Sequence, residues 1–177
     1  EPRDKGEVDR ILEAGNKGPW KVRDITESEM NRAPRAPFTT STLQQRASTR
    51  LGFSPSRTMS VAQRLYEAGL ITYMRTDSTT LSGGAIGTIS KFVENEYGKN
   101  YLEVRQYKTK SKNAQEAHEA IRPTDVGKLK AGANEEQQRL YRLIWARTVS
   151  SQMASAKVLK SKVLVEVANG TVPDFSV

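Results

Sequence analysis

Apolar and polar residues alternate near both ends of this chain, whereas the long middle carries helix signals. The alternation covers residues 20–25 and 157–168, and successive side chains of a strand point to opposite faces. Asn169-Gly170 is a strong hairpin-turn dipeptide, so residues 171–177 are predicted to return as a strand. The pattern therefore predicts one sheet-like unit that the chain leaves and re-enters around a helical domain. Such short strands make an incomplete sheet, which indicates a fragment of a larger protein.

The middle of the chain has clear helix boundaries. A capping box at 41–44 is expected to open a helix that Gly52 closes. Ser54 and Pro55 open a second helix, which ends at Gly69. Two short helices joined by a glycine-containing turn and followed by a strand are typical of helix-turn-helix and winged-helix folds. Further helices are predicted at 85–98, 114–121 and 134–153. The predicted fold class is α+β, mainly helical, with a winged-helix-like helical domain.

Two short stretches outside these helices are predicted to be irregular. Residues 1–18 are mostly polar, with a small apolar set that could cover a neighbouring surface. Residues 26–37 are predicted to be a connector, kept extended by Pro34 and Pro37.

The charge of the chain narrows the class of partner. Its formal net charge is +8, which favours a polyanion such as nucleic acid or a membrane surface. No apolar run approaches the roughly 20 residues that span a bilayer, and no signal peptide opens the chain. A cytoplasmic protein is therefore expected. The absence of cysteine excludes disulfides and thiolate metal sites, and a single histidine excludes a histidine cluster.

The cations gather in blocks that contain few acids. Residues 35–75 hold six arginines against one acid, Glu67. Residues 105–112 hold four cations and residues 139–162 hold six, and neither block has an acid. Such runs are often no more than solvated faces, but three blocks in one chain also suit contact with phosphate.

Residues 70–78 form the candidate site. The segment is rich in β-branched and aromatic residues, so it is predicted to be extended, with Ile71, Tyr73 and Arg75 on one face. A free phenol has a pKa of roughly 10 and is a weak nucleophile, but a nearby cation lowers such a pKa. Arginine also binds phosphate through two parallel N–H bonds. The pair therefore suggests phosphoryl transfer, and the alternative is an edge strand with a packed tyrosine and a solvated arginine.

Four motifs give the chain a family resemblance. They are PFTTSTLQQ at 37–45, AQRLYEAG at 62–69, ITYMRTDS at 71–78 and HEAIRPT at 118–124. In this order and spacing they resemble bacterial type IA DNA topoisomerase I over nearly the whole chain. The resemblance implies that Tyr73 is the nucleophile that forms a 5′-phosphotyrosyl bond with a cleaved single strand of DNA. It also implies that Arg75 stabilises the scissile phosphate, that His118 contacts DNA phosphate, and that Asp77 helps to hold the cleaved strand.

The same resemblance implies parts that this sequence lacks. The family binds Mg²⁺ in a Toprim domain with an Asp-x-Asp-x-Glu motif, and no Asp-x-Asp occurs here. The metal ligands are therefore expected outside these residues, and no metal is expected to bind within them. By resemblance, 36–156 is the helical domain with the catalytic tyrosine, while 1–35 and 157–177 belong to a strand-rich arch (hinge) domain. The expected partners are DNA, chiefly single-stranded, and the Toprim and other domains of the same full-length chain, but no membrane. The fragment alone is expected to be inactive.

Two further residues and two rival functions remain open. Arg122 would share a helix face with His118 and would either contact phosphate or form an ion pair with Glu119 or Asp125. Gln63 is better explained as polar support than as a ligand. A tyrosine recombinase also attacks with tyrosine, but its tyrosine follows the His/Arg motif, whereas Tyr73 precedes it here. The non-enzymatic alternative is a winged-helix-like DNA-binding module without chemistry.

Overall fold

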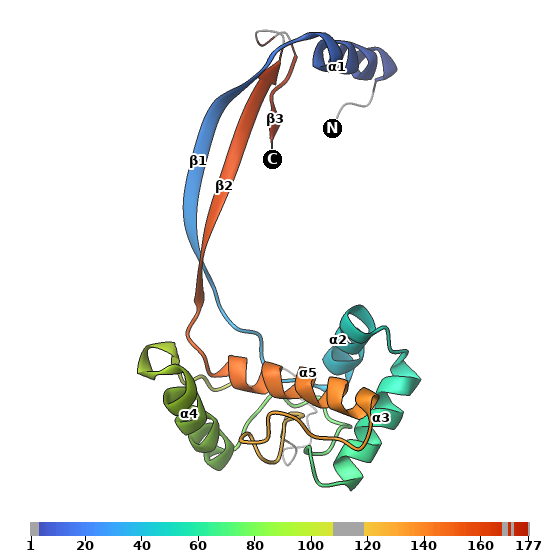
Figure 1. Cartoon of the computed structure of the whole chain (residues 1–177), viewed down its shortest axis with the longest axis vertical. Helices are drawn as coiled ribbons and strands as arrows, with labels where there is room; N and C mark the ends of the chain where they lie inside the picture. The colour runs from blue at the N-terminus through green and yellow to red at the C-terminus, as the bar shows by residue number, and fades with distance from the viewer. Residues whose placement is uncertain (1–3, 108–118, 168–169, 171, 177) are drawn as a thin grey trace. The chain divides into compact units, whose positions relative to one another are not determined.

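The structure is a computed structural model that describes residues 4–107, 119–167, 170 and 172–176 (Figure 1). The chain divides into two compact units. We call Glu1–Arg32 with Ala156–Val177 the strand unit, and Ala33–Ser155 the helical unit. Together they make a mixed α+β fold, as predicted, and each unit is described by itself.

The strand unit begins with a helix that the sequence analysis missed. Helix α1 spans Lys5–Lys17, and the carboxylate of its cap, Asp4, accepts a hydrogen bond from the Glu7 amide at 3.0 Å. The Trp20 indole donates to the Gly15 carbonyl at 3.1 Å and so ties the helix to the strand that follows. No side chain of α1 is buried, although Val8, Ile11 and Leu12 have the i, i+3, i+4 spacing of one helix face.

A long two-stranded ribbon makes up most of this unit. Strand β1 (Trp20–Arg32) pairs antiparallel with β2 (Ala156–Val167), with one irregularity between Val22 and Asp24. The predicted connector at 26–37 is therefore wrong over 26–32, because these residues continue the strand. Every residue of β1 is exposed, so the second half shows no apolar alternation. Its strand conformation depends instead on cross-strand backbone bonds to β2.

The predicted return strand is much shorter than expected. Strand β3 is only Phe175–Ser176, and within the described residues it completes a three-stranded sheet in the order β1-β2-β3. The Phe175 ring lies 5.0 Å from the Trp20 ring, and Arg23 forms a 2.7 Å ion pair with Asp174. Gly170 has the positive φ of a turn, 79°, while Asn169 lies outside the described residues.

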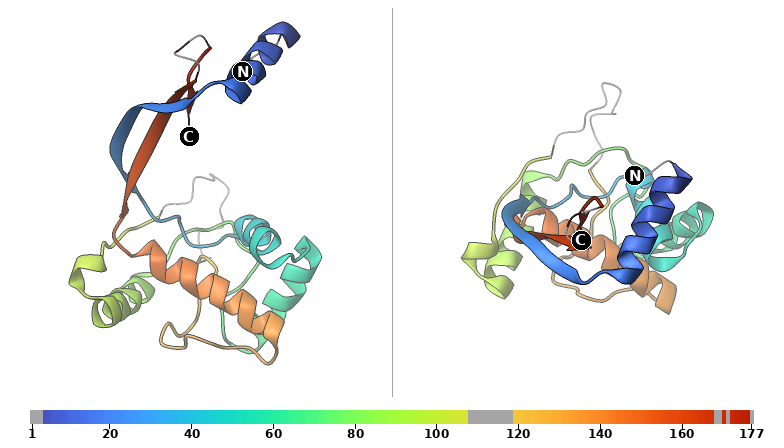
Figure 2. Two further views of the ribbon diagram at one scale, coloured as in Figure 1. Left: turned by 45° about the horizontal axis from the view of Figure 1, so that its top comes forward. Right: turned by 90° about the horizontal axis from the view of Figure 1, so that it is seen from above.

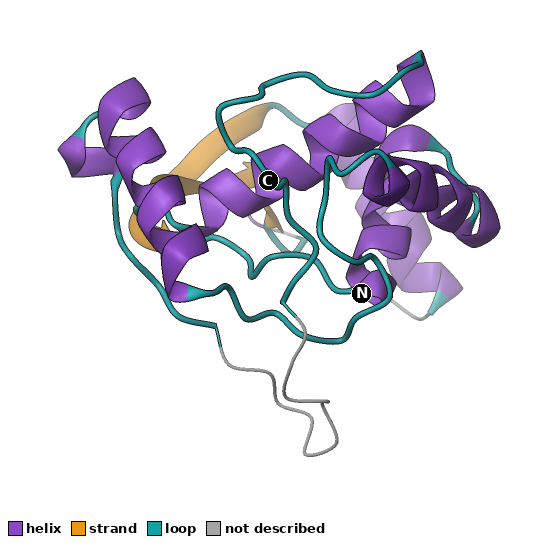
Figure 3. Ribbon diagram, turned by 90° about the horizontal axis from the view of Figure 1, so that it is seen from below, coloured by secondary structure: helices purple, strands orange, loops and turns teal. Residues whose placement is uncertain are grey.

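The helical unit is built around its last helix, α5 (Glu135–Ser151). Helices α2 (Thr40–Leu51) and α3 (Pro55–Glu67) pack against α5 and one another, and α4 (Gly83–Tyr97) also contacts α5 (Figure 2). A short 3-10 helix, η1, spans Lys99–Tyr101 and packs on α4. Long loops run across this unit between the helices (Figure 3). The largest fully buried side chains of the helical unit include Phe38, Leu43, Leu65, Ile71, Met74, Ile121, Leu140, Tyr141 and Ile144.

The helix boundaries show where local signals suffice. Ser54 caps α3 and Pro55 is its first residue, as predicted. The capping box of α2 was placed two residues too late, because Thr39 is the cap and exchanges hydrogen bonds with Thr42. Several neighbouring hydroxyl residues can each serve as a cap. Thr40, the first residue of α2, also bonds Met74 and Thr76, contacts that the sequence does not reveal.

Two predicted elements of this unit are wrong. No helix covers residues 119–121, where the Ile121 amide instead donates to the Phe38 carbonyl at 2.9 Å; residues 114–118 lie outside the described part. Residues 70–78 form no regular strand, and only Ile71 makes an isolated β-bridge, to Pro123. The winged-helix likeness is therefore not confirmed within the described residues.

Within the described part of the chain, no helix is both long enough and apolar enough to cross a membrane.

Candidate active site

The segment that carries Tyr73 is held by its backbone on both sides of the tyrosine. Before it, the Thr72 amide donates to the Arg122 carbonyl at 2.9 Å, and the Thr72 hydroxyl donates to the Ala120 carbonyl at 2.7 Å. After it, the Thr40 hydroxyl donates to the Met74 carbonyl at 2.7 Å. Tyr73 thus lies between two anchored neighbours, Thr72 and Met74, which limits how far its backbone can move.

The anchor of Met74 is the first residue of α2. The Thr40 hydroxyl also accepts a hydrogen bond from the Thr76 amide at 2.9 Å, and the Thr40 amide donates to the Thr76 carbonyl at 2.8 Å. Thr40 is therefore a positioning residue for the Tyr73 segment. Sequence reasoning assigned it no role, because its partners lie 34 and 36 residues away.

Burial along the segment separates two sets of side chains. Met74, Thr76 and Ser78 are buried, whereas Tyr73, Arg75 and Asp77 are exposed. The three candidate residues thus alternate with buried ones, although the segment forms no regular strand. Tyr73 itself keeps 38% of its surface accessible.

The prediction that Ile71 shares the face of Tyr73 is wrong. Ile71 is buried in the core and bridges to Pro123. The alternation breaks at Thr72, whose hydroxyl turns inward to bond the Ala120 carbonyl. The exposed face therefore begins at Tyr73.

A second phenol lies beside the first. The Tyr66 ring, at the end of α3, meets the Tyr73 ring edge-on, with centroids 5.3 Å apart and planes at 67°. Both rings are exposed. Such an edge-to-face pair orients both rings, and it makes Tyr66 the rival nucleophile that any experiment must exclude.

Gln63 lies on the same helix and is half-buried. Its amide donates to the Glu67 carboxylate, one turn further along α3, at 2.7 Å. The supporting role predicted for Gln63 remains a prediction. In the structure, its side chain holds the Glu67 carboxylate.

Arg122 forms one of the two interactions that the sequence left open. Its guanidinium makes two hydrogen bonds to the Glu119 carboxylate, at 2.6 and 3.1 Å, and a third to the Pro123 carbonyl. Glu119 also accepts the Ser82 amide at 2.7 Å, at the cap of α4. Asp125 instead accepts the Gly127 amide. Whether Arg122 contacts phosphate stays a prediction, and His118 lies outside the described residues.

The charge state of Glu119 follows from these contacts. Burial alone would raise the pKa of Glu119, but hydrogen bonds from Ser82 and Arg122 outweigh it and hold the pKa below its ordinary value of 4.5. A lowered folded-state pKa stabilises the protein above that ordinary value, and the contribution disappears as the pH falls through the lower folded value. At neutral pH the pair with Arg122 is therefore intact.

The described residues do not fit a metal site. No three histidine or acidic side chains among them come together in a way that could hold a metal ion. One pocket is lined by three arginines, Arg35, Arg46 and Arg147. Sequence reasoning did not recognise this cluster of positive charge. The acid-poor blocks pointed to these residues separately but not to their meeting.

Replacing Thr40 with valine tests the anchor after Tyr73. Thr40→Val should lower the free energy of unfolding by about 1–3 kcal/mol, since it leaves the Met74 carbonyl and the Thr76 amide without the hydroxyl. Urea unfolding measures the change. Thr49→Val is the matched control, because within the described part of the chain the Thr49 hydroxyl bonds carbonyls of its own helix only. It should shift stability by less than about 0.5 kcal/mol. Equal losses in the two variants would contradict the anchoring role.

Comparisons with known proteins show which proteins the chain is similar to. A family model described as DNA topoisomerase matches residues 2–174. DNA topoisomerase 1 of Synechococcus elongatus is 49% identical over 171 residues, covering 94% of this chain and 19% of that protein. DNA topoisomerase 1 of Mycolicibacterium smegmatis is 54% identical over 143 residues, covering 77% of this chain and 15% of that protein.

A solved structure gives the same result. Full-length topoisomerase I from Thermotoga maritima superposes with a TM-score of 0.76 at 34% identity, covering 99% of this chain and 29% of that one. The chain thus spans about a fifth or less of the length of these curated relatives. With both the sequence and the fold matched over nearly its whole length, the chain belongs to the bacterial type IA DNA topoisomerase I family.

Proposed function

We propose that this chain is part of an enzyme that cleaves and rejoins one DNA strand through a 5′-phosphotyrosyl intermediate and so relaxes negative supercoils. The observation that carries the proposal is the exposed Tyr73 on a segment fixed by Thr72 and Thr40. A nucleophile held in place loses little freedom when it meets its phosphate. Membership of the topoisomerase family supports the same reaction. Such an enzyme acts on the chromosome, in the cytoplasm with the nucleoid.

The proposed chemistry exchanges one ester for another. The Tyr73 hydroxyl loses its proton and attacks phosphorus, a P–O bond to tyrosine forms, and the bond from phosphorus to the 3′-oxygen breaks. The released 3′-oxygen takes up a proton. Rejoining is the reverse, with the 3′-hydroxyl attacking the phosphotyrosine and Tyr73 leaving. One ester forms for each that breaks, so the cycle needs no oxidant and no external energy.

The neighbouring side chains have separate roles in this proposal. Arg75 binds the scissile phosphate and stabilises the charge that develops on it. Asp77, exposed next along the same face, holds the cleaved strand, and His118 contacts a nearby phosphate. Arg122 is already bound to Glu119, so we assign it to fixing the segment that pairs with Thr72; a phosphate contact would require that pair to open.

The remaining machinery lies outside these residues. We propose that the helical unit is the domain with the catalytic tyrosine and that the strand unit is part of the arch (hinge) domain. The described residues do not fit a magnesium site. The Toprim domain of the full-length chain would supply Mg²⁺ and the acid for the 3′-oxygen, and single-stranded DNA would be the substrate.

The polarity of the covalent product tests the proposal. Full-length enzyme is incubated with single-stranded oligonucleotides labelled at either end and then denatured. Attachment through a 5′-phosphate, which leaves the 3′ label on the protein, is the expected result. Attachment through a 3′-phosphate would support the tyrosine recombinase instead, and the absence of any adduct would support a DNA-binding module without chemistry.

The 177-residue chain alone should neither relax supercoiled plasmid nor cleave DNA efficiently. Its sequence supplies a tyrosine and phosphate-binding cations but no Asp-x-Asp motif for magnesium, and a proton donor for the leaving oxygen usually contributes about 10²–10⁴-fold. Gel analysis of plasmid topoisomers measures this, with the full-length enzyme as the positive control. Robust magnesium-dependent relaxation by the chain alone would contradict the division of labour.

A further inference from the structure

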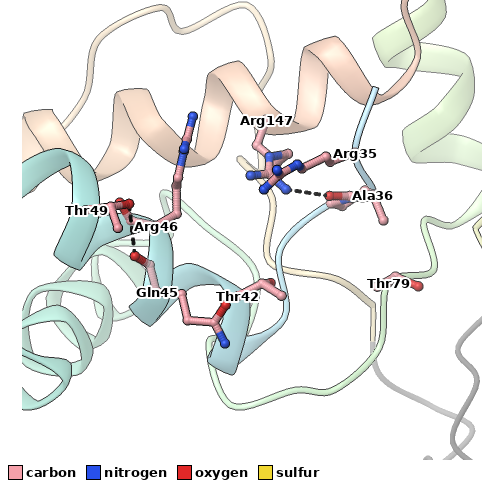
Figure 4. Close-up of a pocket in the computed structure, with 9 residues that line it drawn as sticks. Arg35, Ala36, Thr42, Gln45, Arg46, Thr49, Thr79 and Arg147 are labelled. Carbon is pink, nitrogen blue, oxygen red and sulfur yellow. Dashed lines mark hydrogen bonds between the residues drawn. The ribbon is translucent and has the colours of Figure 1, made fainter. Parts of the chain in front are cut away.

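Three arginines from separate parts of the helical unit meet at one pocket of about 360 Å³ (Figure 4). Arg35 precedes α2, Arg46 lies on α2 and Arg147 lies on α5. The other lining residues are Ala36, Pro37, Thr42, Gln45, Thr49 and Thr79. The lining therefore combines three guanidinium groups with hydroxyl and amide side chains. The Thr42 and Thr49 hydroxyls already donate to backbone carbonyls, so the guanidinium groups are the main donors that the pocket offers an anion.

Arg147 is held in place before any ligand arrives. Its guanidinium donates to the Ala36 carbonyl at 3.2 Å, and its central carbon lies 4.2 Å from the centroid of the fully buried Phe38 ring. Stacking on an aromatic ring and a backbone bond fix the guanidinium plane. The remaining N–H groups are thus preorganised for a ligand.

Among the described residues, no acid forms an ion pair with the three arginines of this pocket. No carboxylate is among the nine lining residues. By contrast, other arginines of the helical unit have glutamate partners: Arg57 pairs with Glu136, Arg105 with Glu103 and Arg122 with Glu119.

The mutual repulsion is visible in the pKa of Arg147. Burial lowers the pKa of Arg147, and the charges of Arg35 and Arg46 lower it further. Like charges held together without a counter-charge raise the free energy of the unliganded pocket. An anion bound among them would relieve that repulsion.

The pocket shares its scaffold with the Tyr73 segment. Thr42 lies two residues after Thr40, which bonds Met74 and Thr76, and Thr79 lies six residues after Tyr73. Six residues of extended chain span at most about 20 Å. A strand bound at Tyr73 therefore needs only a few nucleotides to reach the Thr79 side of the pocket.

We propose that Arg35, Arg46 and Arg147 bind backbone phosphates of the DNA strand held at Tyr73, a few nucleotides from the scissile phosphate. This inference rests on the proposed function. Three cations exceed the single charge of one phosphodiester, so the pocket suits adjacent phosphates of a strand. A free phosphate ion has related chemistry, and the experiment separates the two sources.

The test is equilibrium binding of fluorescent single-stranded oligonucleotides to the 177-residue chain, measured by anisotropy over a range of salt. Arg35→Gln/Arg46→Gln removes two pocket charges and spares the packed Arg147. The matched control, Lys130→Gln/Arg142→Gln, removes two exposed charges elsewhere in the same unit. Urea unfolding checks that both double variants are folded.

The pocket variant should bind roughly tenfold more weakly at about 0.1 M salt. The slope of log K against log salt should become shallower by about 1.4, which corresponds to two lost phosphate contacts on a single strand. The control should keep most of the affinity and the slope. Losses that are equal in the two variants, or no loss in the pocket variant, would overturn the proposal.

Two further experiments separate a DNA strand from a free phosphate ion as the ligand, and the pocket proposal from the proposed cleavage reaction. If longer oligonucleotides bind no more tightly than inorganic phosphate does, the pocket takes a free anion and the strand assignment is overturned. Adduct formation by full-length enzyme tests Tyr73 independently. If the full-length enzyme forms the adduct and the pocket variant binds DNA as tightly as the unmodified chain, only the pocket proposal is refuted. If the pocket variant binds DNA more weakly but the full-length enzyme forms no adduct, the cleavage reaction is refuted and the pocket remains a nucleic-acid site.

Discussion

Tyr73→Phe should abolish the covalent protein–DNA adduct in the full-length enzyme. The substitution removes only the hydroxyl that would attack phosphorus, and it keeps the ring that packs edge-on against Tyr66. DNA affinity should therefore remain nearly unchanged, since the cations of the site are untouched. Denaturing gels with a 3′-labelled oligonucleotide measure the adduct, and anisotropy measures binding.

Tyr66→Phe is the matched control for this prediction. It deletes the same atom from the neighbouring exposed ring, 5.3 Å away between centroids, and should leave adduct formation largely intact. If Tyr73→Phe still forms adduct while Tyr66→Phe does not, the nucleophile has been assigned to the wrong tyrosine.

Arg75→Ala should slow cleavage by roughly 10²–10³-fold, which is the usual scale for removing one preorganised donor to developing charge. Binding should weaken much less, because many other cations contribute to it. Single-turnover cleavage separates the two effects. Arg75→Lys should recover only part of the rate, because an ammonium group cannot make the planar two-bond contact of a guanidinium.

Arg142→Ala is a suitable control for Arg75, since Arg142 is another exposed arginine of the helical unit. Its cleavage rate should be close to that of the unmodified enzyme. If Arg75→Lys has full activity, Arg75 acts only as a general positive charge. That result would contradict its proposed two-bond contact with the scissile phosphate.

Local sequence signals predicted the parts of the fold that depend on local chemistry. The Ser54-Pro55 start of α3 follows from capping. The alternation of exposed Tyr73 and Arg75 with buried Met74 follows the predicted two-residue spacing, although the segment forms no regular strand. The second half of β1 could not be predicted in this way. It is exposed on both faces, so its conformation depends on pairing with β2, more than a hundred residues later.

The candidate site was likewise only partly predictable. The motif around Tyr73 pointed to Tyr73 and Arg75, whose catalytic roles remain predictions. The support of this segment comes from Thr40, whose bonds to Met74 and Thr76 form only after folding. The arginine pocket was hidden for the same reason. Its Arg147 bonds Ala36 across a separation of 111 residues, and a charge count shows acid-poor blocks without showing which of their members meet.

The most direct test of the central claim is to locate the DNA on the protein. Adduct from the full-length enzyme is digested with nuclease and trypsin, and the peptide that retains a phosphate or nucleotide is analysed by tandem mass spectrometry. Trypsin releases residues 65–75 as one peptide, and this peptide contains both Tyr66 and Tyr73, so the fragment ions must assign the modified residue. A nucleotide on Tyr73 is the predicted result; a nucleotide on Tyr66, or on any other peptide, would contradict the account.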